Sequence, residues 1–117
     1  DCVERIGPRT VIFNVAGTID LADSWLDIDN PFITIVGHTA PGDGVQVKNG
    51  GFRIRTDDVI IRHMRFRSGT WFSNPDGTGV CCANNADGIA IQGDRNIIID
   101  HSSVSWSVDE AFSTVVL

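Results

Sequence analysis

The most regularly placed carboxylates in this sequence are Asp87 and Asp109. Asp87 opens the segment DGIAIQG, residues 87–93, and Asp109 opens a looser copy of it, DEAFSTV, residues 109–115. If the two copies stack in neighbouring turns of one fold, the two carboxylates lie about one strand spacing, ~4.8 Å, apart. Carboxylate oxygens held that close together suit a hard divalent cation. The other interpretation is that both acids only form the turns that precede strands.

Proton-transfer chemistry is suggested by Asp100 and His101, an acid followed directly by an imidazole. Neighbours on a strand point to opposite faces of a sheet, so we expect that these two side chains do not hydrogen-bond to each other. A structural role is therefore favoured for both. His63 ends an earlier copy of the same segment, and this predicts that the rings of His63 and His101 stack.

Arginines alternate along two predicted strands, at Arg53 and Arg55 and again at Arg65 and Arg67. Alternating residues share one face of a strand, so the pattern predicts a basic stripe. One interpretation is that the stripe faces an anionic ligand, for which Arg65 and Arg67 are the candidate contacts. The other is that it is a solvated face balanced by nearby acids.

The framework for these residues is predicted from four short segments that align without gaps. Each contains a turn-forming pair, then three or four β-branched or apolar residues, then Gly, Asn or His. Their starts are 23, 26 and 38 residues apart, and the last interval contains an insertion rich in Gly, Asn, Asp and Pro, residues 68–84. The spacing predicts a coil of about two dozen residues. The segments are Pro8–Asn14, Pro31–Gly37, Asp57–His63 and Arg95–His101.

A second repeated pattern supports this period. The segment DGVQVKN, residues 43–49, matches residues 87–93, so each coil offers at least two short strands. Alternating apolar residues in the first set, such as Ile35, Ile61 and Ile99, are expected to point inward and to stack on one another. Equivalent strands separated by a whole coil favour parallel stacking over hairpins, and no amphipathic segment of helical length separates them.

The predicted fold class is therefore all-β, a right-handed parallel β-helix of about four to five coils that is truncated at both ends. Residues 1–117 are expected to form a single β-helix segment, with a loop insertion at about 68–84. The open ends of such a helix carry unpaired backbone groups. We expect these ends to stack on another chain or on further coils.

The composition limits the classes of ligand that we expect. The chain has 117 residues, 42% hydrophobic and 21% charged, so neither disorder nor a membrane span is favoured. The net charge of -6 disfavours nucleic acid and anionic lipid as partners. An acidic polymer would be repelled unless a cation, most simply a divalent metal ion, lay between it and the protein. Cys2, Cys81 and Cys82 do not have the spacing of a zinc site and are interpreted as a structural disulfide or buried thiols.

Several motifs together are similar to one family, the family-1 pectate lyases, over nearly the whole chain. The sharpest is IIDH, residues 98–101, with acidic residues shortly after it. The resemblance implies a secreted, Ca²⁺-dependent enzyme that cleaves polygalacturonate by β-elimination, although the chain shows no signal peptide. The segments that carry the resemblance are 8–20, 39–44, 57–69, 96–101 and 105–110.

The resemblance also implies site residues. By motif position the family's calcium-binding acids map onto Asn85, Asp87, Asp109 and Ser113. Asn85 and Ser113 are uncharged where the family usually has aspartates, so a weaker calcium site is expected. Glu110 is a candidate replacement, but alternation along a strand would turn it away from Asp109. The catalytic base of the family is an arginine, expected beyond Leu117, so the isolated chain is expected to be inactive.

A competing hypothesis is a noncatalytic β-helix that acts as a polysaccharide-binding or self-assembling structural module. The weakened set of acids and the open coil ends favour it. Trp71 and Phe72, in the insertion, bear on both hypotheses, because they either stack on sugar rings or form a small satellite core.

Overall fold

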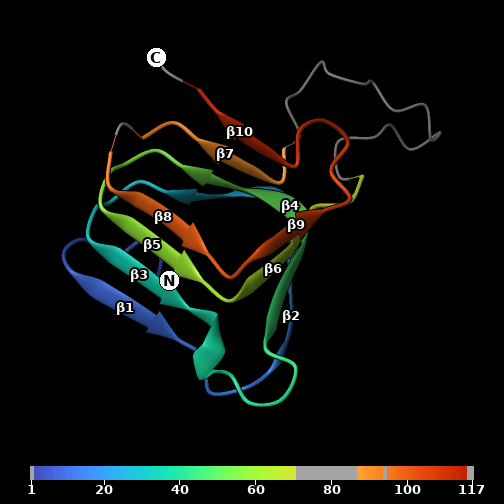
Figure 1. Cartoon of the computed structure of the whole chain (residues 1–117), viewed down its shortest axis with the longest axis horizontal. Coiled ribbons are helices and arrows are strands. Elements are labelled where there is room, and N and C mark those ends of the chain that lie inside the picture. The colour runs from blue at the N-terminus through green and yellow to red at the C-terminus, as the bar shows by residue number, and fades with distance from the viewer. Residues whose placement is uncertain (1, 71–86, 94, 116–117) are drawn as a thin grey trace.

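The computed structural model of the chain describes residues 2–70, 87–93 and 95–115, and these residues form two parallel sheets that wind around one axis (Figure 1). Every strand pairing between them is parallel. The strands are β1 (Arg9–Ile12), β2 (Gly17–Ile28), β3 (Ile33–Val36), β4 (Val45–Ile54), β5 (Val59–Arg62), β6 (Met64–Arg67), β7 (Ile89–Ile91), β8 (Ile97–Asp100), β9 (Ser103–Ser105) and β10 (Phe112–Thr114), and η1 (Gly37–Thr39) is a short 3₁₀ turn. The predicted parallel β-helix is confirmed.

The first sheet has the order β1-β3-β5-β8 and contains the four repeated segments. Ile35 pairs with Ile61, and Ile61 pairs with Ile99, so residues about one coil apart lie directly over one another, as predicted. The alignment of the first segment was wrong by one residue. Val11, not Ile12, pairs with Ile35, because this register turns Val11 toward the core and leaves Ile12 60% exposed.

The second sheet is built around β4, whose ten residues pair with different strands along their length. The first half of β4 pairs with β6, which pairs in turn with β9. The second half pairs with β7, which pairs with β10. Strand β2 lies along both halves of β4, with an irregularity in register between Asp20 and Ser24. Figure 1 shows the two branches diverging from β4.

This branching corrects the second predicted repeat. Residues 43–49 and 87–93 do not stack, because Val45 pairs with Met64 while Ile89 pairs with Phe52. Residues 43–49 lead into and form the first half of the long strand β4, whereas residues 87–93 contain the short strand β7, which pairs with the second half of β4. The alternation that the two segments share does not show this difference.

The core is a ladder of aliphatic side chains enclosed by the two sheets. Ile33, Val59 and Ile61 come from the first sheet and are at most 1% exposed, and Ile54 and Ile89 of the second sheet are fully buried. Phe52 and Phe66 pack edge to face, with ring centroids 5.0 Å apart. Burial of these side chains is the main source of stability, at about 25 cal/mol for each Å² of apolar surface removed from water.

Equivalent turns recur from coil to coil. Phe32, Asp58 and Asn96 precede β3, β5 and β8, and each has a positive φ, near 60°. The Asn96 side-chain amide donates a hydrogen bond to the Asp58 carboxylate over 2.8 Å. Asn and Asp tolerate this left-handed conformation better than most residues. These turns set where each coil of the first sheet begins.

Two sequence expectations concern residues that the structure does not describe. Most of the predicted insertion, including Trp71, Phe72, Cys81 and Cys82, falls within residues 71–86, so the expected extent of the insertion and of the domain stay predictions. The described residues include no helical segment with the length and hydrophobicity of a membrane span.

Candidate functional site

Three acids meet where β7 and β10 begin. One carboxylate oxygen from each of Asp87, Asp109 and Glu110 lies within 4.8 Å of the others. Asp87 lies two residues before the start of β7, and Asp109 and Glu110 lie in the bend that leads into β10. Because β7 and β10 are neighbouring parallel strands, the coil brings together acids that are more than 20 residues apart in sequence. We call these three residues the acid cluster.

Asp87 is the buried member of the acid cluster and is only 5% exposed. The Ser113 hydroxyl donates a hydrogen bond to Asp87 Oδ2. Asp87 Oδ1 is buried as well, and no described residue donates a hydrogen bond to it. A buried carboxylate oxygen without a partner is costly, because burial removes the water that would solvate its charge. A cation at this oxygen would remove that cost.

The negative charges of the acid cluster act on one another. A hydrogen bond with its own backbone lowers the pKa of Glu110, but the charge of Asp109, desolvation and the charge of Asp87 together raise that pKa above its ordinary value. A raised pKa of this origin shows that like charges are crowded, a crowding that a bound divalent cation would relieve. The donor set, carboxylate oxygens with a nearby hydroxyl, is the kind that Ca²⁺ takes in proteins.

The structure brings together most of the residues proposed from the sequence as calcium ligands. Asp87 and Asp109 lie in the acid cluster, and Ser113 contacts Asp87, whereas Asn85 lies outside the described residues. The expectation for Glu110 was wrong. Asp109 and Glu110 lie in a bend rather than a strand, so strand alternation does not apply and both carboxylates reach the cluster.

The predicted basic stripe is divided between the two branches of the second sheet. Arg53 lies on the half of β4 that pairs with β7 and Arg55 directly follows that strand, whereas Arg65 and Arg67 lie on β6. Arg65 donates a hydrogen bond to the Asp43 carbonyl, and Arg67 donates to the Ser103 hydroxyl over 3.0 Å. A substrate-binding role for Arg65 and Arg67 therefore stays a prediction. Any such binding would take place on the β6 branch of the sheet and not at the acid cluster.

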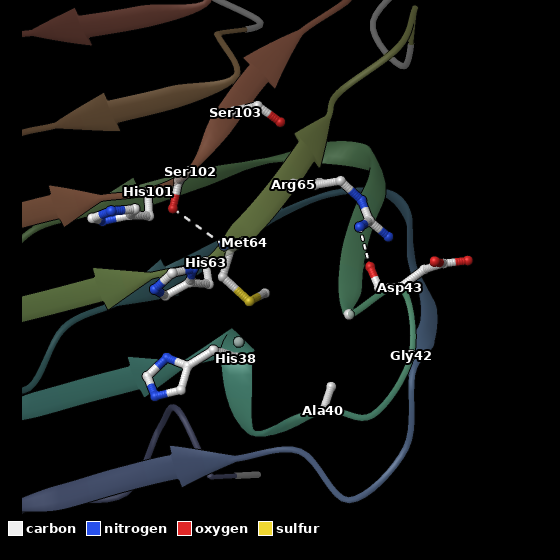
Figure 2. Close-up of a pocket in the computed structure, with 12 residues that line it drawn as sticks. His38, Ala40, Gly42, Asp43, His63, Met64, Arg65, His101, Ser102 and Ser103 are labelled. Carbon is white, nitrogen blue, oxygen red and sulfur yellow. Dashed lines mark hydrogen bonds between the residues drawn. The ribbon is translucent and has the colours of Figure 1, made fainter.

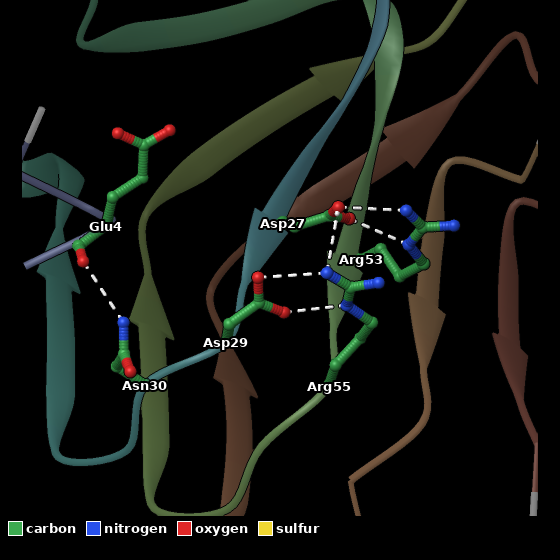
Figure 3. A network of polar contacts seen from close by, with 6 residues as sticks. All are labelled: Glu4, Asp27, Asp29, Asn30, Arg53 and Arg55. Carbon is green, nitrogen blue, oxygen red and sulfur yellow. Dashed lines mark hydrogen bonds and ion pairs between the residues drawn. The ribbon is translucent and has the colours of Figure 1, made fainter.

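The positive charges of Arg53 and Arg55 are balanced by nearby carboxylates, as one of the two interpretations of the stripe predicted. Arg53 makes a bidentate ion pair with Asp27 over 2.7 and 2.8 Å, and Arg55 makes another with Asp29 over 2.6 and 2.9 Å (Figure 3). Arg55 also lies 3.3 Å from Asp27, so the four side chains form one network. Such fork-shaped pairs fix guanidinium orientation better than a single contact does.

The network makes a prediction about acid stability. The hydrogen bond from Arg55 lowers the pKa of Asp29, so the folded state holds this carboxylate ionised more readily than the unfolded chain does. The resulting stability is present above the unfolded pKa and is lost as the pH falls through the folded one. Asp29→Asn is expected to lower the melting temperature by about one to a few degrees at neutral pH, and by less in acid.

Thermal unfolding across the acid range measures this effect, with Asp43→Asn, on the exposed turn before β4, as the control. A pH-independent difference between the parent and Asp29→Asn would show that the ion pair does not cause it.

A groove of about 480 Å³ lies at the turn between β5 and β6 (Figure 2). Three exposed imidazoles border it in a column. The rings of His63 and His101 stack with centroids 4.8 Å apart and 21° between their planes, which confirms the predicted pair. His38, which the sequence did not single out, packs edge-on against His63 at the same centroid distance. The column joins the turns of three successive coils.

The expectation that Asp100 and His101 do not hydrogen-bond was wrong. His101 Nδ1 lies 2.7 Å from an Asp100 carboxylate oxygen. Strand β8 ends at Asp100, and His101 has a φ of 48°, so the chain has left the extended conformation and the two side chains are no longer turned apart. The contact fixes the orientation of one ring in the histidine column.

Fold and site together define the class of protein, a parallel β-helix with a crowded acid cluster at the start of neighbouring strands.

Three fungal proteins illustrate what the sequence is similar to, each named probable pectate lyase C. The chain is 40% identical to the one from Aspergillus flavus over 115 residues, which is 97% of the chain and 24% of that protein. It is 39% identical to the one from Emericella nidulans and 41% identical to one from Aspergillus fumigatus, each over 106 residues, 90% of the chain and 22% of the relative.

No protein-family model matches the chain. The chain spans about a quarter of the length of the curated relatives that it matches. Over nearly all of its own length it is nevertheless a homologue of these fungal proteins named probable pectate lyase C, so the resemblance found in the sequence is confirmed.

Proposed function

We propose that this chain is part of a secreted enzyme that cleaves uronate-containing polysaccharide, polygalacturonate above all, by calcium-assisted β-elimination. The observation that carries the proposal is the buried Asp87 Oδ1, which has no partner among the described residues and adjoins two further carboxylates. The names of the relatives, probable pectate lyase C, support the same class of substrate.

The proposed role of the acid cluster follows from its charge. Asp87, Asp109 and Glu110 would hold the calcium ion, with the Ser113 hydroxyl orienting Asp87. When bound, the ion would neutralise the uronate carboxylate and withdraw charge from it, which is Lewis-acid assistance. Without a cation, the crowded acids would repel a polyuronate, in keeping with the net charge of -6.

The proposed reaction breaks the bond between C4 and the glycosidic oxygen. A base removes the proton from C5, the electron pair of that C–H bond forms a C4–C5 double bond, and the oxygen leaves with the rest of the polymer. The base that the resemblance implies is an arginine, which we expect outside the described coils. The described coils would bind and orient the substrate, and their edge strands β1 and β8 would pair with further coils.

The test is an elimination assay on the intact protein that contains this chain. With polygalacturonate and Ca²⁺, the ultraviolet absorbance of the unsaturated product is expected to rise, and a calcium chelator is expected to abolish the rise. A folded, calcium-loaded protein that binds polygalacturonate without forming product would contradict the enzyme and favour the noncatalytic module.

A further inference from the structure

The surface beside the acid cluster holds a fixed arginine. Along one line across the second sheet, Asp27 pairs with Arg53, Arg53 pairs with Ala90, and Ala90 pairs with Ser113. Phe52 and Ile54 of β4 are buried, so Arg53 between them points to the outside of the sheet. Arg53 therefore lies two strand spacings, about 10 Å, from the serine that contacts Asp87.

Arg53 is held in one orientation by two neighbours. Its Nε and Nη2 donate to the two carboxylate oxygens of Asp27, as Figure 3 shows. Its guanidinium carbon also lies 5.1 Å from the centroid of the Trp25 ring, within the range of a cation–π contact. A side chain fixed on two sides loses little further entropy when it binds a ligand.

Trp25 links Arg53 to the acid cluster. A Cβ on Gly51 would lie 2.3 Å from Trp25 Cζ3 and 2.8 Å from the Asp87 carbonyl oxygen, so only glycine leaves room for the ring at this place. The indole therefore lies over the backbone of β4 and close to that of Asp87. The short side chain of Ala90, which is 5% exposed, lies between Arg53 and Ser113 in this row across the sheet.

The chemistry of Arg53 suits a carboxylate. Its contacts with Asp27 use Nε and Nη2, which leaves Nη1 to donate elsewhere, and its side chain is 27% exposed. A guanidinium donor paired with a carboxylate is among the stronger hydrogen bonds in proteins. Arg65 and Arg67 lie on the other branch of the sheet, so Arg53 is the arginine on the β7 side that the register aligns with Ser113.

We propose that Arg53 binds a carboxylate of an acidic polysaccharide, on a sugar next in line to the one held at the acid cluster. Asp27 and Trp25 are the positioning residues for this subsite. The inference rests on the proposed function and deepens it, because it sets the direction in which the polymer extends from the acid cluster, across Ala90 toward β4 and β2.

The test uses oligogalacturonates of increasing length and the intact protein with Ca²⁺. Arg53→Gln is expected to weaken binding of the longer oligomers by about tenfold, the effect of losing one charge-assisted hydrogen bond. The shortest oligomers, which reach only the acid cluster, are expected to bind as they do to the parent protein. Arg53→Lys keeps the charge but loses the fork, and an intermediate loss is expected. Trp25→Phe is expected to act in the same direction through Arg53.

The matched control is Arg62→Gln, which removes an arginine that pairs with Asp100 on the first sheet. Arg55 still contacts Asp27 in Arg53→Gln, so this variant is expected to fold, with a melting temperature at most a few degrees below that of the parent and an unchanged Ca²⁺ affinity. If Arg53→Gln and Arg62→Gln bind long oligomers equally, the subsite is wrong while the proposed function stands. If the parent binds neither Ca²⁺ nor any oligomer, both proposals fail together.

Discussion

Asp87→Asn is expected to lower the Ca²⁺ affinity of the intact protein by about 100-fold or more without lowering its thermal stability in the absence of calcium. Asp87 supplies the buried oxygen that lacks a partner, so its charge is the one that a cation compensates most. In the calcium-free protein the same charge is a cost, and removing it is expected to leave the melting temperature unchanged or higher. Elimination activity at limiting calcium is expected to fall with the affinity.

Calorimetric titration with Ca²⁺ and thermal unfolding with and without a chelator measure these two effects. Asp43→Asn, on an exposed turn, is the control for a lost carboxylate of the same type. A variant that loses stability but keeps its calcium affinity would assign Asp87 a structural role through its contact with Ser113.

Ile61→Ala is expected to lower the free energy of unfolding by about 2–5 kcal/mol. Ile61 is fully buried in the middle of the ladder between Ile35 and Ile99, so the missing methyl and methylene groups leave a cavity that rigid neighbouring coils fill poorly. Denaturant unfolding of the intact protein measures the change. Ile98→Ala, on the outer face of β8, is expected to cost only about 0.5 kcal/mol, since Ile98 is 47% exposed.

Equal losses for the two isoleucine variants would contradict the stacked core. The comparison is informative because Ile61 and Ile98 are the same residue type on neighbouring strands of one sheet, and they differ in which face of the sheet they occupy.

The first sheet of the fold was predictable because its pattern is strictly local. Alternation of apolar residues decides which side chains face inward, and alignment of the repeated segments, with the insertion set aside, decides which residues stack, so the contacts of Ile61 follow from the sequence. The second sheet was not predictable in the same way. Strand β4 bends and divides its partners between β6 and β7, and identical alternation in residues 43–49 and 87–93 does not reveal the division.

The candidate site, too, could be predicted only in part from the sequence. Asp87 and Asp109 could be placed together because they open segments that lie on neighbouring strands. The position of Glu110 and the contact between Asp100 and His101 could not be predicted from the sequence. Both depend on backbone that leaves the extended conformation just outside a strand, at the bend before β10 and at His101. Arg53 was visible in the sequence as part of a stripe, but its alignment with Ser113 depends on a register that only the structure supplies.

The most direct test of the account is the structure of the intact protein crystallised with Ca²⁺. We expect one ion at the start of β7 and β10, with oxygens of Asp87, Asp109 and Glu110 at about 2.3–2.6 Å from it. Crystals that contain Ca²⁺ elsewhere, or none at saturating concentration, with Asp87 Oδ1 bound instead to a protein donor, would contradict it.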